Sequence, residues 1–145
     1  MIRAALSLMF MPATLMAGEV TVEAPVVPLA PPGAVAHAAY FTLANTGDTP
    51  RQLIGVSAEG YMMAHIHRTE VSGDVAMMSS VDALEIPPGQ SVVFAHGGLH
   101  VMLMRPTAPL EKGGQVELTL EFANGEAIPV SAIVVPFKDL QAHGS

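Results

Sequence analysis

The stretch QVELTLEFANGEAIPVSAIVV, residues 115–135, decides the fold class of this chain. Apolar and polar side chains alternate strictly over its first eight residues. One face carries Val116, Leu118, Leu120 and Phe122, and the other Glu117, Thr119 and Glu121. Such alternation is typical of a strand with one buried face. Asn124-Gly125 separates it from a second strand over residues 127–135, and an Asn-Gly pair in this setting predicts a β-hairpin.

The same pattern recurs along the chain. Further strand-like segments lie at residues 20–22, 37–45, 51–57, 63–71, 75–79, 91–95 and 99–104. Ser72-Gly73-Asp74 and His96-Gly97-Gly98 predict two more hairpins, while four prolines in residues 24–33 indicate a loop or an extended edge segment. No segment shows sustained helical periodicity. Eight or nine short strands at near-regular spacing predict an all-β, antiparallel sandwich or barrel.

The first 17 residues have the composition of a secretory signal peptide. Arg3 supplies a basic start, residues 4–17 carry no charge, and Ala17 is a small residue at a plausible cleavage point. The apolar run is too short to span a bilayer. We therefore expect a signal peptide over residues 1–17, one β-domain over 18–136 and a short flexible tail over 137–145, with the exported chain inserted in no membrane.

Composition excludes several classes of protein. The 145 residues include no cysteine, so a disulfide framework, a thiolate zinc site and a blue-copper centre are ruled out. A net charge of −7 gives no electrostatic case for binding nucleic acid. The chain has no nucleophile elbow, no His-Glu-x-x-His, no phosphate-binding loop and no dinucleotide fingerprint. The sequence thus predicts no enzyme activity.

Methionine and histidine cluster in one window. Outside the predicted signal peptide, every methionine lies between Met62 and Met104, and four of the six histidines fall in the same window: His65, His67, His96 and His100. Thioether sulfur is a soft ligand and imidazole an intermediate one, so the two together without thiolate favour copper, especially Cu(I).

The strand period places these donors on shared faces. His100, Met102 and Met104 alternate with Val101 and Leu103, so the three donors point to one side. If Ser72-Gly73 forms the turn, His67 lies directly opposite Met78. If Gly73-Asp74 forms it, the two are diagonal neighbours on one face, and a three-residue loop would put them on opposite faces. Joining both strand pairs would give two imidazoles and two thioethers, a neutral set that suits a monovalent soft cation.

The spacing His67-x10-Met78-x21-His100-x-Met102 resembles the ligand pattern of the periplasmic copper chaperones called PCuAC. The segments YFTL (40–43), EIP (85–87) and GLHVMLM (98–104) are also similar to that family, and the resemblance covers residues 20–135. It implies a cupredoxin-like, Greek-key β-barrel that binds one Cu(I) per chain in the periplasm. It further implies His67, Met78, His100 and Met102 as ligands, with delivery of copper to cytochrome c oxidase centres.

The chain departs from the family pattern at a few positions. His65 stands where an acidic residue is common, Ala76 stands where another methionine is common, and only His143 remains of a His/Met-rich tail found in some relatives. These departures leave the Cu(I) site intact and do not support a second, tail-based site. His65 is a possible auxiliary ligand, and Met104 is either an auxiliary residue beside the ligands or a packing residue.

The remaining histidines and methionines have simpler interpretations. We expect no function for His37, His96 and His143, packing or loop roles for Met62 and Met63, and a core-facing Met77.

Three functions are compatible with this set of residues. The first is a monomeric periplasmic Cu(I) chaperone that passes its ion by ligand exchange to an acceptor, such as an oxidase subunit or another copper chaperone. The second is a copper buffering or resistance protein without a dedicated acceptor. The third is an interaction sandwich whose Met/His face docks a partner protein without metal.

Overall fold

The computed structural model describes residues 19–139, so the predicted signal peptide and His143 lie outside the described residues. Ten strands and one 3-10 helix make up this part of the chain. The strands are β1 (Val20–Pro28), β2 (Ala36–Asn45), β3 (Arg51–Ala58), β4 (Tyr61–Ser72), β5 (Val75–Ser80), β6 (Leu84–Ile86), β7 (Ser91–Val93), β8 (Leu99–Pro106), β9 (Gln115–Phe122) and β10 (Ala127–Val135); the 3-10 helix is Phe137–Asp139. No helix in this part of the chain is long and apolar enough to cross a membrane.

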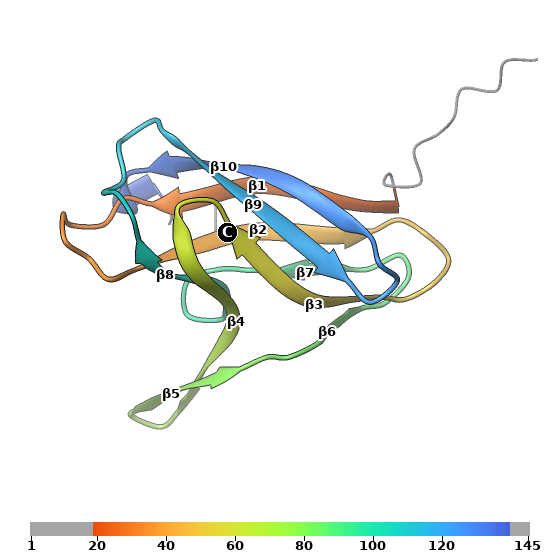
Figure 1. The fold of residues 1–145 in the computed structure, drawn as a ribbon. Helices are drawn as coiled ribbons and strands as arrows, with labels where there is room; N and C mark the ends of the chain where they lie inside the picture. Colours follow the sequence, from red (N-terminus) through yellow and green to blue (C-terminus); the bar gives the residue numbers. More distant parts are fainter. Residues whose placement is uncertain (1–18, 140–145) are drawn as a thin grey trace, which may run out of the picture.

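The strands form one curled sheet in the order β5-β4-β8-β2-β1-β10-β9-β3-β6, with β7 paired to β2 (Figure 1). All neighbouring pairs between these strands are antiparallel except β1 and β10, which run parallel. The predicted all-β architecture is confirmed. The strand number exceeds the expected eight or nine because the three-residue β6 is too short to show an alternation pattern.

The core forms where the alternating faces of different strands meet. Val116, Leu118, Leu120 and Phe122 of β9 are all buried, as their alternation predicts. They join one hydrophobic cluster with residues from most other strands, among them Leu43, Leu53, Ile86, Val101 and Leu103. A well-packed cluster of this kind holds the inner face of β8 rigidly, and that strand carries part of the site described below.

The predicted β9–β10 hairpin is confirmed. Its loop extends beyond Asn124-Gly125, because Phe122 N–H donates to the Glu126 carbonyl, and only Gly125 in that loop has a positive φ, of 88°. Another local prediction was wrong. Residues 96–98 do not close a hairpin, since β7 and β8 pair with successive parts of β2. The proline-containing segment 24–28 is extended, as one of its two alternatives had it, and continues β1 after an irregularity at Ala24, whose φ is 50°. It is not an edge segment, because β1 lies between β2 and β10.

The β4–β5 ribbon extends away from the rest of the sheet (Figure 1). Strand β5 pairs only with β4 among the described strands, and all six of its residues are exposed. Met77 is 66% exposed, so the expectation that it faces the core was wrong. Alternation correctly separates Met77 from Met78, but both faces of the ribbon are open to solvent at this distance from the core.

Candidate metal centre

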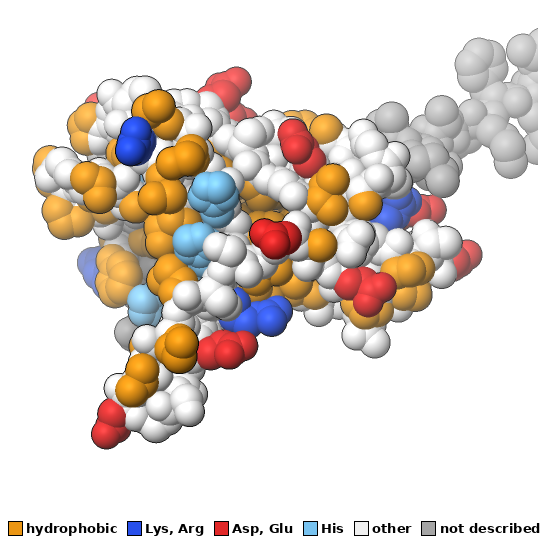
Figure 2. Space-filling view, turned by 60° about the horizontal axis from the view of Figure 1, so that its bottom comes forward, with side chains coloured by type: hydrophobic (Ala, Val, Ile, Leu, Met, Phe, Trp, Pro, Cys, Tyr) orange, Lys and Arg blue, Asp and Glu red, His pale blue; other side chains and the backbone are white. Residues whose placement is uncertain are grey.

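The site lies on the outer face of the β4–β8 strand pair. Three cross-strand pairs follow one another along it: His67 with His100, His65 with Met102, and Met63 with Met104. Between them, Ile66, Val101 and Leu103 are at most 4% exposed and point into the core. Since side chains alternate along a strand, the six donors of these pairs share the opposite, outward face. Figure 2 shows histidine side chains among hydrophobic ones near the base of the ribbon.

The β4–β5 hairpin adds a seventh donor. Ser72 pairs with Val75, so Gly73-Asp74 forms the turn, and Gly73 has the positive φ of 61° that such a turn favours. In this register Thr69 lies opposite Met78, and His67 is its diagonal neighbour. The His67 Nδ1 atom lies 3.2 Å from the Met78 sulfur. Of the three turns considered from the sequence, the structure selects the diagonal arrangement.

His100 is held in one orientation. It is 5% exposed, and its Nδ1 atom lies 3.1 Å from the Gly98 carbonyl oxygen. Because a carbonyl only accepts, Nδ1 must carry the proton and donate, which leaves the Nε2 lone pair for a metal. The ring of His67 meets that of His100 edge to face, with centroids 5.8 Å apart. A buried, oriented imidazole thus stands across from a more accessible one.

The environment of His67 favours its neutral form. Desolvation by burial lowers the pKa of this imidazole, and the nearby His100 and His65 lower it further. Metal ions bind the neutral imidazole, so a lowered pKa keeps His67 ready to coordinate at mildly acidic pH.

Met102 is placed between two histidines. It lies directly opposite His65 and is a diagonal neighbour of His67. The His65 and His67 rings are nearly parallel, with an interplanar angle of 10° and centroids 6.2 Å apart. The structure therefore gathers His67, Met78, His100 and Met102 on one surface, and it places His65 and Met104 on the same face.

The sequence interpretation passed over Met63. This residue is 42% exposed and pairs directly with Met104. Its position two residues before His65 places it on the same strand face as the histidines. That fact points to the site only once β4 is known to pair with β8.

The histidines given no function have other surroundings. His37 is 4% exposed and its Nδ1 atom lies 2.6 Å from the Tyr61 hydroxyl oxygen. It is a buried residue rather than a surface one. His96 is exposed and its ring meets that of Phe137 edge to face, in the first turn of the segment expected to be a tail.

The donor set decides which metals the site can hold. Within residues 19–139, no three or more His, Asp or Glu side chains gather in an arrangement that could hold a metal ion. Any ion on this face would depend on methionine sulfur in addition to imidazole. Such neutral, soft donors favour Cu(I) over hard divalent ions.

Comparison with known proteins identifies relatives of this chain. The family model described as "Putative lipoprotein LpqE-like" matches residues 20–134. "Putative lipoprotein Lxx21020" of Leifsonia xyli subsp. xyli is 34% identical over 103 residues, and "Uncharacterized protein RP573" of Rickettsia prowazekii is 34% identical over 92. These alignments cover 70% and 62% of this chain but only 60% and 51% of the relatives' lengths.

Solved structures resemble the chain more completely. The "Copper-bound PCuAC domain from PmoF2" has a TM-score of 0.69 and 26% identity, covering 82% of this chain and 94% of that one. The solution structure of "CuI-DR1885" from Deinococcus radiodurans has a TM-score of 0.66 and 32% identity, covering 81% and 78%. The predicted cupredoxin-like fold is confirmed by these likenesses. Because the family model spans most of the chain and PCuAC domains share both its fold and its sequence, this chain belongs to the LpqE-like family of PCuAC-type copper chaperones.

Proposed function

We propose that this protein carries one Cu(I) ion in the periplasm, bound by His67, Met78, His100 and Met102. The observation that carries the proposal is the 3.2 Å approach of the His67 Nδ1 atom to the Met78 sulfur, with the His100 ring beside it. If Nδ1 carries the ring proton, it donates only a weak hydrogen bond to the thioether sulfur. In the other tautomer lone pairs of both atoms face each other, and a soft cation shared between them would make the arrangement favourable.

The four ligands differ in how firmly they are held. His100 is buried and oriented by Gly98, whereas Met78 is 54% exposed on an edge strand. An acceptor could therefore replace the Met78 thioether first and the two histidines later. Copper would pass from protein to protein by ligand exchange without release as a free ion, which is the chemistry that a chaperone requires.

The proposal also includes the cellular location of the protein and the protein that accepts its copper. The basic and apolar composition of residues 1–17 supports export to the periplasm. The lipoprotein names of the family and of a relative agree with an exported protein. The partner is an acceptor copper protein, such as a cytochrome c oxidase subunit or another copper chaperone. The protein acts as a monomer and without catalysis.

The binding test is an anaerobic Cu(I) titration of the mature protein against a competing chelator. Met78→Leu keeps the side-chain size but removes the sulfur, and we expect it to weaken Cu(I) binding strongly. Met77→Leu is the matched control, because Met77 is on the same strand with similar exposure but on the other face. Equal affinities for the two variants would contradict the proposal. Copper X-ray absorption of the reduced, loaded protein should show two sulfur and two nitrogen neighbours.

A copper-transfer experiment distinguishes a chaperone from a buffering protein. Copper-loaded protein is mixed with the apo copper domain of an oxidase subunit, and the metal content of both is measured after separation. Movement of copper to the acceptor supports delivery, whereas retention by the loaded protein favours the buffering function.

A further inference from the structure

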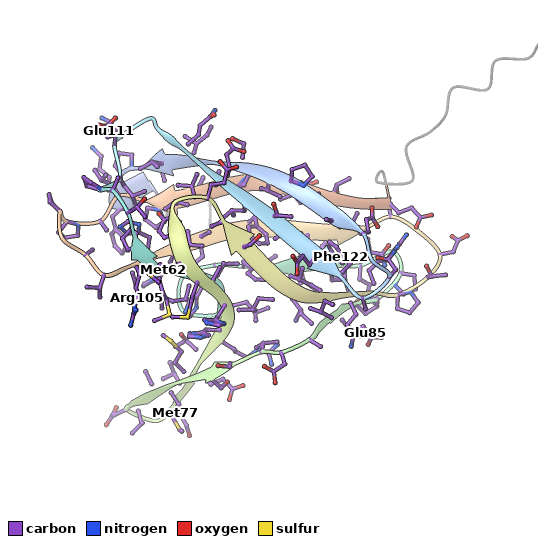
Figure 3. All side chains as sticks on the ribbon, in the orientation of Figure 1. Met62, Met77, Glu85, Arg105, Glu111 and Phe122 are labelled. Atoms are coloured by element: carbon purple, nitrogen blue, oxygen red, sulfur yellow. The ribbon has the colours of Figure 1, made fainter. Side chains whose placement is uncertain are left out.

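The outward donors of β4 and β8 extend beyond the four proposed ligands. The His67–His100 pair is followed by His65–Met102 and then by Met63–Met104. Figure 3 shows sulfur atoms gathered between the labelled Met62 and Arg105 and the base of the ribbon. Together the three pairs form a continuous band of imidazole and thioether groups, which we name the soft-donor band.

We propose that Met63, Met104 and His65 form a second, weaker Cu(I) site at the far end of this band. Met63 and Met104 are directly opposed, and His65 is the next outward residue along β4. Directly opposed Cβ atoms lie about 4.5–5.5 Å apart and diagonal ones about 7–8 Å apart, within reach of long side chains. These three neutral donors, two thioethers and one imidazole, can therefore reach a single ion without any backbone rearrangement.

Packing does not account for this end of the band. Met63 is 42% exposed and Met104 is only partly buried, although both residues could fill core space if they pointed inward. The inward positions beside them belong to Ala64 and Leu103 instead. Methionines facing each other on an open surface are available to a metal in a way that core methionines are not.

The distance between the pairs implies a separate second metal site and not an extension of the first site. The Met63–Met104 pair lies four residues along β4 from the His67–His100 pair. At about 3.4 Å per residue, this separation is roughly 14 Å, too far for one ion to bind both pairs. The intervening His65–Met102 pair can contribute to either position, and repulsion between two copper ions in so exposed a setting is weak.

The second site would bind copper less tightly than the first. It offers no residue as buried and oriented as His100, and the guanidinium of Arg105 follows Met104 directly on an exposed part of β8. An ion bound there would be an intermediate on the path into or out of the first site. This inference rests on the proposed function, because it assumes that copper is the cargo.

The experiment is a stepwise anaerobic Cu(I) titration of the full mature protein carrying 13C-labelled methionine methyl groups. The first equivalent should shift the methyl signals of Met78 and Met102, and the second those of Met63 and Met104. Met63→Leu should weaken the second step at least about tenfold and leave the first unchanged. Met62→Leu is the control, since Met62 is exposed but alternates to the other side of β4.

The outcomes are distinguishable. A first step with the expected shifts, followed by no movement of the Met63 and Met104 signals, would overturn the second site and leave the proposed function intact. Equal affinities of Met63→Leu and Met62→Leu for the second Cu(I) equivalent would also overturn the second site. Loss of the first step by Met63→Leu would show a single site and contradict the inference. Absence of any Cu(I) binding by the wild type would overturn both proposals.

Discussion

Two hairpins of this molecule follow the same alternation rule with opposite results. In the β9–β10 hairpin, every second residue of β9 enters the core and the others face water. In the β4–β5 hairpin, all six residues of β5 are exposed, and β4 pairs with β8 only over residues 61–68. The first hairpin is stabilised by burial of a whole face, whereas the second depends mainly on its ladder hydrogen bonds.

The difference shows how the candidate site combines order with accessibility. A two-stranded ribbon without a covered face is only marginally stable by itself. Met78 lies on that ribbon, while His100 and Met102 lie on β8, whose inner residues Val101 and Leu103 are fully buried. One proposed ligand is thus carried by the least supported element and two by a rigid one. The proposed function, which requires an ion to be both held and released, is compatible with this combination.

The largest expected effect tests the rigid region. Leu120→Ala removes a fully buried side chain from β9 and should lower the free energy of unfolding by about 2–5 kcal/mol. Val71→Ala, at the 70% exposed end of β4, should change it by no more than about 0.5 kcal/mol. Urea unfolding followed by circular dichroism measures both. Similar losses for the two variants would mean that the ribbon packs against something in solution.

Loss of a proposed ligand should affect copper far more than the fold. His67→Ala should weaken Cu(I) binding by more than about 100-fold, because even residues that merely orient metal ligands contribute 10–100-fold. His96→Ala serves as the control, since this exposed histidine lies against Tyr40 and Phe137, outside the soft-donor band. Chelator competition gives the affinities. A His67 variant that binds copper like the His96 variant would remove His67 from the site.

The base of β4 provides a test of intermediate size. Tyr61→Phe removes the hydroxyl that lies 2.6 Å from the Nδ1 atom of buried His37, and it should cost about 1–3 kcal/mol of stability. Tyr40→Phe should cost less, because its hydroxyl lies 3.5 Å from His96, an exposed residue. Thermal and urea unfolding of the two variants make the comparison. If Tyr61→Phe proves the milder change, the hydroxyl contact with His37 does not anchor the first residue of β4.

The smallest effect is a pH dependence of the metal-free protein. Burial, with help from His100 and His65, lowers the pKa of His67 below its usual 6.5. Between that lowered pKa and 6.5 the unfolded chain binds more protons, so stability falls as the pH drops through this window. The change should be small because water reaches the ring. An NMR titration of the His67 ring should show the low pKa, and a value above 6.5 would contradict the geometry.

Copper binding should weaken over the same pH range. Protons compete with the metal for the imidazoles, whereas the thioethers do not titrate. His67→Ala should therefore reduce the slope of Cu(I) affinity against pH as well as the affinity itself.

Much of the fold could be predicted because its signals are local. Alternation in residues 115–122 predicts both the strand and its buried face, and the structure confirms each of the four inward residues. The sequence allows three turns between β4 and β5, and two of them place His67 and Met78 on one face. The wrong predictions concern contacts between segments that are distant in the sequence. They are the partner of β7, the parallel pairing of β1 with β10, and the exposure of Met77.

By itself, the sequence determined which side chains share a face, because the period of a β-strand is a property of the local backbone. It thereby grouped His100 with Met102 and kept Met78 apart from Met77. Only the tertiary structure decided that β4 lies beside β8, which brings His67 to His100 and Met63 to Met104 across more than thirty residues of chain. Strand pairing at that distance depends on which buried faces pack together, and no local pattern encodes that choice.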